Sequence, residues 1–334
     1  METRFRSRWS YDPVLKQGEP FAISDFTQLH LQIFQLLARH RHLRTSYFPA
    51  FAGMNAAYVQ FVLRVLAANP NRYLDRVDGN TYANSNYRDQ IYELTKRGEA
   101  VLRQRGIPIP EDRLGDKALL SHSLMANDTM ASLALGCRSG RIVWWDELSQ
   151  HPRFPKDAAK KLHVKIRKHF GKGMHHAEFD YNNDSNGIFA IDAGSAYKFF
   201  SLEAEHTNRV NCSNLNQASF LKKLLAIQFI MDNQLYKKQW GLPNLLHLVV
   251  TPNQTRIETM KNLILEETNG KGVSYILFKA IPTMEGFEPM KPMPQLYTAP
   301  WQRAGHPDIS IGKEVMQIEL REQTRPREGV DSKA

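Results

Sequence analysis

Cysteine is scarce in this chain, with Cys137 and Cys212 the two examples in 334 residues. So few cysteines argue against a disulfide framework and a cysteine-rich zinc site, and they favour a reducing cytosol. No apolar run is long enough to span a bilayer. Residues 1–9 are charged and lack the apolar core of a signal peptide. We therefore expect a cytoplasmic protein that does not enter a membrane.

Acidic residues are outnumbered by basic ones. The chain has 44 Lys and Arg against 34 Asp and Glu, which gives a formal net charge of +10 and a pI of about 9.5. This balance favours an anionic partner, with nucleic acid first and an acidic membrane surface second. The length is sufficient for two domains with separate hydrophobic cores.

Apolar residues in the first third recur at helical spacing and then give way to short β-like runs. The pattern predicts helices at 26–37, at 45–51 and around 59–66, two strands at 72–77 and 87–92, and a further helix at 93–102. The dipeptide Asp78–Gly79 between the strands is typical of a tight turn. Three helices followed by a two-stranded wing predict a winged helix-turn-helix domain over residues 20–110.

A winged helix contacts DNA through its third helix in the major groove and through its wing on the phosphates. The residues that we expect to make these contacts are Asn55, Gln60 and Arg64 on the helix, and Arg72, Arg76 and Arg88 on or near the wing. The alternative is that this domain contacts protein instead.

A pair of acids follows a predicted hairpin in the second half of the chain. Two β-rich runs, 187–191 and 197–207, flank the polar turn 192–195. Glu203 and Glu205 are two positions apart on the second strand and so share one face. Their like charges repel unless a cation lies between them, and hard oxygen ligands suit Mg²⁺ or Mn²⁺. The alternative is a solvated strand end with two acidic residues.

The remaining pattern of the second half predicts a mixed sheet with helices on both faces, spanning residues 115–285. The predicted helices are 119–135, 219–227 and 254–265, and the predicted strands besides the hairpin are 142–145, 245–250 and 274–278, the last of which closes the sheet. We therefore expect the α/β class, with an α+β arrangement for the chain overall. We expect residues 286–334 to form a C-terminal extension that is partly disordered.

Lysines are dense between positions 156 and 172, where Lys160, Lys161, Lys165 and Lys168 are candidates for DNA contact. Such a density neutralises backbone phosphates regardless of sequence. The alternative is a solvated helix face. Four histidines lie in and just after this stretch, but without paired cysteines or a helical spacing with acids they do not indicate zinc.

Several sequence patches, in this order, carry a resemblance to a known family: residues 36–43, 92–98, 122–128, 199–207, 222–225 and 248–252. The order of elements resembles the restriction-endonuclease-like fold. More specifically, the chain looks like the replication-relaxation family of plasmid and mobile-element proteins, which relaxases of the MobC mobilization type also resemble. The likeness covers roughly residues 25–265.

This resemblance implies metal-assisted hydrolysis of a phosphodiester. Asp184, Glu203 and Glu205 would hold Mg²⁺ or Mn²⁺, Lys223 would stabilise charge on the phosphate, and Asp128 would orient the water or a second ion. The implied partners are plasmid origin DNA and other relaxosome proteins. No tyrosine stands out as a nucleophile, so we expect hydrolysis without a covalent protein–DNA link.

The sequence departs from the family pattern at three points, the first of which is that Glu205 stands where the second acid of the strand is usually Asp. The family strand usually begins with Pro-Asp, whereas here Asn186 replaces the acid or Asp184 reaches the site from two residues earlier. No lysine follows two residues after Glu203, so Lys222 or Lys223 would supply that charge from the next helix. These departures leave two alternatives open: an inactive origin-binding or regulatory protein, and a mobile-element or defence nuclease.

Overall fold

The computed structural model describes residues 23, 25–77, 90–110, 120–137, 141–152, 154–156, 162–170, 173–181, 187–194, 196–205, 219–282 and 291–315. Contacts between Cα atoms divide the chain into two compact units, residues 1–113 with 289–291 and residues 114–288 with 292–334. None of the helices in the described ranges has the length and apolar character that a membrane crossing needs.

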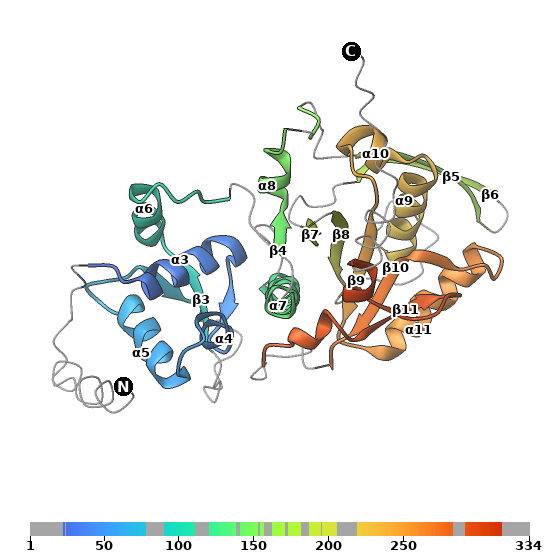
Figure 1. The fold of residues 1–334 in the computed structure, drawn as a ribbon. Coiled ribbons are helices and arrows are strands. Elements are labelled where there is room, and N and C mark those ends of the chain that lie inside the picture. The colour runs from blue at the N-terminus through green and yellow to red at the C-terminus, as the bar shows by residue number, and fades with distance from the viewer. Residues whose placement is uncertain are drawn as a thin grey trace, which may run out of the picture. The chain divides into compact units, whose positions relative to one another are not determined.

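The first unit combines helices with a small antiparallel sheet (Figure 1). Its sheet has the order β1-β3-β2, so β3 lies between the other two strands. The side chains of Phe34, Leu37 and Leu63 are completely buried in its core. The elements are α3 (Gln28–His40), β1 (Leu43–Arg44), α4 (Tyr47–Ala52), α5 (Ala56–Ala67), β2 (Leu74–Arg76), β3 (Ile91–Leu94) and α6 (Lys96–Gln104).

Helix α6 begins later than the sequence predicted. Glu93 and Leu94 continue β3 and pair with Asp75 and Leu74 of β2, so their backbone groups bond within the sheet. The hydroxyl of Thr95 then accepts a hydrogen bond from the Gly98 N–H at 3.3 Å and caps the helix. The predicted turn Asp78–Gly79 lies outside the described residues.

The second unit is built on a seven-stranded mixed sheet with the order β12-β11-β10-β9-β8-β7-β4. Strands β8, β9 and β10 run parallel, and the other neighbours are antiparallel. The strands are β4 (Arg141–Trp144), β7 (Ile188–Asp192), β8 (Tyr197–Ala204), β9 (Leu246–Thr251), β10 (Val273–Ala280), β11 (Pro300–Ala304) and β12 (Ile309–Ser310).

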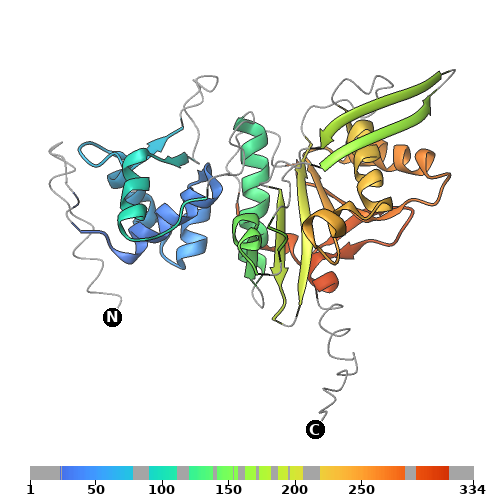
Figure 2. The ribbon, with the colours of Figure 1, turned by 90° about the horizontal axis from the view of Figure 1, so that it is seen from above.

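Helices cover both faces of this sheet, as the sequence predicted (Figure 2). On one face, α9 (Phe220–Asp232) and α11 (Gln254–Glu267) share a hydrophobic core with Phe199, Val249 and Phe278. Helix α7 (Leu120–Gly136) packs against β8 from the other face. This unit also contains the shorter helices α8 (Trp145–Ser149) and α10 (Leu235–Trp240), the 3₁₀ turn η2 (Pro294–Leu296) and a helical turn over residues 311–315. The α/β class expected from the sequence is confirmed.

The sequence analysis expected β10 to be the last strand of the sheet, but the sheet continues beyond it. Strands β11 and β12 extend it, so part of the expected extension 286–334 belongs to the folded sheet. Trp301 is completely buried, and its indole N–H donates to the Leu296 carbonyl oxygen at 2.9 Å. The short strands beside Pro300 offered too few alternating residues to be recognised.

Residues 162–170 of the lysine-rich stretch form the first strand of a β-hairpin, which excludes the alternative of a solvated helix face there. Strands β5 (Leu162–Phe170) and β6 (Gly173–Tyr181) pair in an antiparallel ladder. Leu162, Val164 and Ile166 are buried at every second position, which is the period of a strand.

Candidate functional site

The acidic pair lies at the carboxyl end of β8, beside the parallel strand β9. Glu203 is the register partner of Val249. Glu205 follows the last strand residue, and its backbone N–H donates to the Val250 carbonyl oxygen at 2.8 Å. The carboxyl ends of neighbouring parallel strands form one edge of the sheet, where α/β proteins usually bind ligands.

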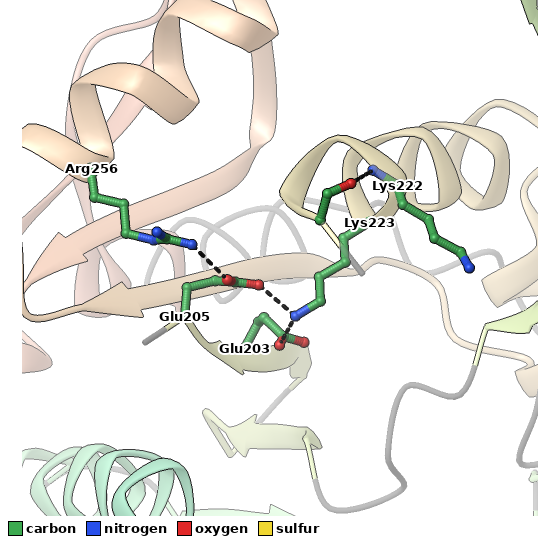
Figure 3. A network of polar contacts seen from close by, with 6 residues as sticks. Glu203, Glu205, Lys222, Lys223 and Arg256 are labelled. Atoms are coloured by element: carbon green, nitrogen blue, oxygen red, sulfur yellow. Dashed lines mark hydrogen bonds and ion pairs between the residues drawn. The ribbon is translucent and has the colours of Figure 1, made fainter. Parts of the chain in front are cut away.

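A lysine ammonium lies between the two carboxylates. Lys223 Nζ donates to Glu203 Oε1, and also to Glu205 Oε1 at 2.5 Å (Figure 3). Its helix α9 is capped by Ser219, whose hydroxyl accepts from the Lys222 N–H at 3.2 Å. Figure 3 shows the Lys222 side chain pointing away from the acids. Of the two lysines considered from the sequence, Lys223 is the one that reaches them.

Arg256 completes the cluster from the first turn of α11. Its Nη2 lies 3.3 Å from Glu205 Oε2, on the side opposite Lys223 (Figure 3). Asn253 caps this helix by accepting a hydrogen bond from the Arg256 N–H at 3.3 Å. The sequence analysis missed Arg256, because this residue is 51 positions from Glu205 in the chain. Only the tertiary structure brings the start of α11 next to the end of β8.

The cluster combines two carboxylates with two cations, so its formal charges balance. The Glu205 side chain is fully buried, whereas Glu203 is 29% exposed and Lys223 is 24% exposed. Burial lowers the pKa of Lys223, but the charges of Glu203 and Glu205 and their hydrogen bonds outweigh it and raise the pKa overall. Lys223 is therefore a cation at neutral pH.

The donor set suits a hard divalent cation in kind and in number. Mg²⁺ in nucleic-acid enzymes is commonly held by one or two carboxylates together with phosphate and water oxygens, and Glu203 and Glu205 supply two. Within the described ranges, no group of three or more His, Cys, Asp and Glu side chains could hold a metal. Asp184, the third expected ligand, lies outside those ranges. A cation between the carboxylates would take the place of the Lys223 ammonium.

Asp128 is not brought together with the acidic pair. It is completely buried on α7, which lies on the opposite face of the sheet from α9 and Lys223 (Figure 2). Sequence spacing indicated a helix at this place but not the face of the sheet that the helix covers.

The expected DNA-contacting residues of the first unit have different environments. Asn55 caps α5, since its side-chain oxygen accepts from the Ala57 N–H at 2.9 Å. Asn55 is exposed, and so are Gln60 and Arg64 on α5, Arg72 after it and Arg76 on β2. Arg88 lies outside the described residues.

The lysines expected to contact DNA in the stretch 156–172 are described in part. Lys165 is 60% exposed, and its Nζ lies 3.2 Å from Glu178 Oε1 on the paired strand. Lys160, Lys161 and the side chain of Lys168 lie outside the described part of the chain.

Comparison with known proteins gives one family. The model described as replication-relaxation matches residues 34–183. Neither the curated proteins nor the solved structures gave a match. The matched range begins within α3, runs through the β5–β6 hairpin and ends before Glu203 and Lys223. The resemblance to the replication-relaxation family that the sequence predicted is therefore confirmed over residues 34–183.

Proposed function

We propose that this protein processes the DNA of plasmids or mobile elements, by binding origin DNA and nicking it through metal-dependent hydrolysis of a phosphodiester. The family match indicates a protein related to replication or mobile elements. The observation that carries the proposed chemistry is the convergence of Glu203, Glu205 and Lys223 at the end of β8. The same proposal includes a restriction-endonuclease-like fold for the second unit and a winged-helix fold for the first unit.

Each residue of the cluster has a chemical role in this proposal. Glu203 and Glu205 would hold Mg²⁺ or Mn²⁺, which lowers the pKa of a bound water and polarises a phosphate. Lys223 would donate to the phosphate oxygen on which charge develops in the transition state. Asp184 would be a third ligand.

A second candidate is a DNA-binding protein with an inactive nuclease-like unit. The balanced charges of the cluster favour it, because Lys223 and Arg256 satisfy both carboxylates without a metal. A buried salt-bridge network of this kind is sufficient to explain why the acids are paired.

Incubation with supercoiled plasmid that carries the origin distinguishes the two candidates. The nicking proposal predicts open circles in Mg²⁺ or Mn²⁺ and none in EDTA. DNA binding without open circles in either metal would support the second candidate instead.

The lysine-rich stretch 156–172 should bind DNA through phosphate charge. Replacing Lys160, Lys161, Lys165 and Lys168 by Ala should weaken binding to every sequence, and the negative slope of log K against log salt should become shallower by roughly 0.9 for each lost phosphate contact. A matched control replaces four lysines elsewhere: Lys237, Lys238, Lys261 and Lys271. Fluorescence anisotropy at several salt concentrations measures the DNA affinity and its salt dependence. An equal loss of affinity in the two variants would show that the lysine-rich stretch contributes no more to DNA binding than lysines elsewhere.

The first unit should supply site preference. Removal of residues 1–110 should abolish discrimination between origin DNA and other DNA, while the second unit remains folded because it has its own buried core. Competition binding measures the discrimination, and cooperative urea unfolding of the truncated chain is the control. A truncated protein that still selects the same site would contradict the winged-helix assignment.

A further inference from the structure

Glu205 differs from Glu203 in its access to water. Its side chain has no exposed area, whereas that of Glu203 keeps 29%. Both Glu205 oxygens contact a cation, Oε1 with Lys223 Nζ at 2.5 Å and Oε2 with Arg256 Nη2 at 3.3 Å. A buried carboxylate that loses every counter-ion is strongly destabilising, because neither water nor protein then compensates its charge.

Lys223 is shared, so its contacts limit what it can do. The ammonium donates to both Glu203 and Glu205. Contact with a phosphate, or replacement by a metal ion, requires at least one of these interactions to break. Glu203 is already partly open to water, whereas Glu205 has no exposed area in this structure and its charge is compensated by protein contacts. The departure of Lys223 therefore requires a second cation that stays with Glu205.

Arg256 has the position and the chemistry for that task. The Asn253 cap fixes its backbone, and the neighbouring Ile257 and Met260 are completely buried and hold α11 on the sheet. A guanidinium is less strongly hydrated than an ammonium, so Arg256 is the less costly cation to keep beside a buried acid.

We propose that Arg256 is the permanent counter-ion of Glu205, a positioning residue that holds this carboxylate in place while Lys223 exchanges its contacts for a divalent cation and a phosphate. The exchange step rests on the proposed function. The counter-ion role is independent of it and is tested separately.

A double-mutant cycle in the full-length protein tests the counter-ion role. Lys223→Met and Arg256→Met each leave Glu205 with one cation, so each should raise the unfolding equilibrium constant moderately. The double variant leaves it with no cation from the described residues, and should raise that constant by about tenfold more than the product of the two single effects. Urea unfolding measures all four proteins.

The same cycle with Glu205→Gln separates a charge effect from lost packing. The excess destabilisation should disappear, because no buried carboxylate remains, and a double variant that fails to fold should fold again. Arg256→Lys combined with Lys223→Met should recover most of the stability, since it keeps a cation. Additive effects of Lys223→Met and Arg256→Met would overturn the counter-ion role. So would an excess destabilisation of the same size in the Glu205→Gln background, or a double variant that stays unfolded when Glu205→Gln is added.

Binding of Mn²⁺ alone tests the exchange. Lys223→Met should bind Mn²⁺ about tenfold more tightly than the wild type, because the competing ammonium is gone and Arg256 still holds Glu205. Unchanged or weaker binding would overturn the exchange. Plasmid nicking by the wild type tests the proposed function itself, so the two failures are distinguishable.

Discussion

Lys223→Met should lower the rate of metal-dependent plasmid nicking by about 10²–10³-fold, the usual effect of losing a donor to charge that develops in a transition state. Lys222→Met should leave the rate close to that of the wild type. Both lysines lie on the first turn of α9, but Figure 3 shows that Lys223 alone of the two reaches Glu203 and Glu205. The initial rate of open-circle formation measures both variants.

The two lysine variants carry the same loss of charge, so each is a control for the other. Their DNA affinities should agree, since one lysine in 44 Lys and Arg changes nonspecific attraction little. Nicking at the wild-type rate by both variants would show that Lys223 has no catalytic role. An equal loss in both would show that the effect comes from general charge near α9.

Glu203→Gln should abolish Mg²⁺-dependent nicking and leave DNA affinity within a few-fold of the wild type. The amide keeps the size of the side chain but removes a charged ligand for the metal. Because the Glu203–Lys223 pair is partly exposed, its loss should change the free energy of unfolding by about 1 kcal/mol or less.

Glu258→Gln is the matched control for Glu203→Gln. Glu258 is a half-exposed acid on α11 that pairs with Lys261 at 3.6 Å, so the substitution removes the same charge outside the cluster. It should nick like the wild type. Nicking by Glu203→Gln at the wild-type rate would contradict the assignment of the acidic pair as the active centre.

Much of the fold follows from local sequence signals. The apolar run at β9, the hairpin of β7 and β8, and the capped helices α9 and α11 all have patterns that strand or helix periodicity predicts. Strand β11 has no such pattern, because its two buried residues, Trp301 and Ala304, are three positions apart and do not alternate. The start of α6 was placed too early because pairing of Glu93 with Asp75 overrides the helical preference of that segment.

The candidate site was predictable where it depends on one strand and not where it depends on packing between helices. Period-2 alternation placed Glu203 and Glu205 on one face, and the absence of a nearby lysine pointed to α9. The side of the sheet on which α7 lies, which separates Asp128 from the acids, is decided by tertiary packing. Tertiary packing also brings Arg256 next to Glu205. The repulsion expected between the acids is relieved by the ammonium of Lys223.

The most direct test of the central claim, that the acidic pair is a metal-dependent centre, measures the melting temperature of the wild type and of Glu203→Gln with increasing Mn²⁺. Binding to the folded state at 100 times the dissociation constant adds about 2.7 kcal/mol of stability, which should raise the wild-type melting temperature by several degrees. The rise should be largely lost in Glu203→Gln. No rise in the wild type, or an equal rise in both proteins, would contradict the claim and leave the cluster a salt-bridge network.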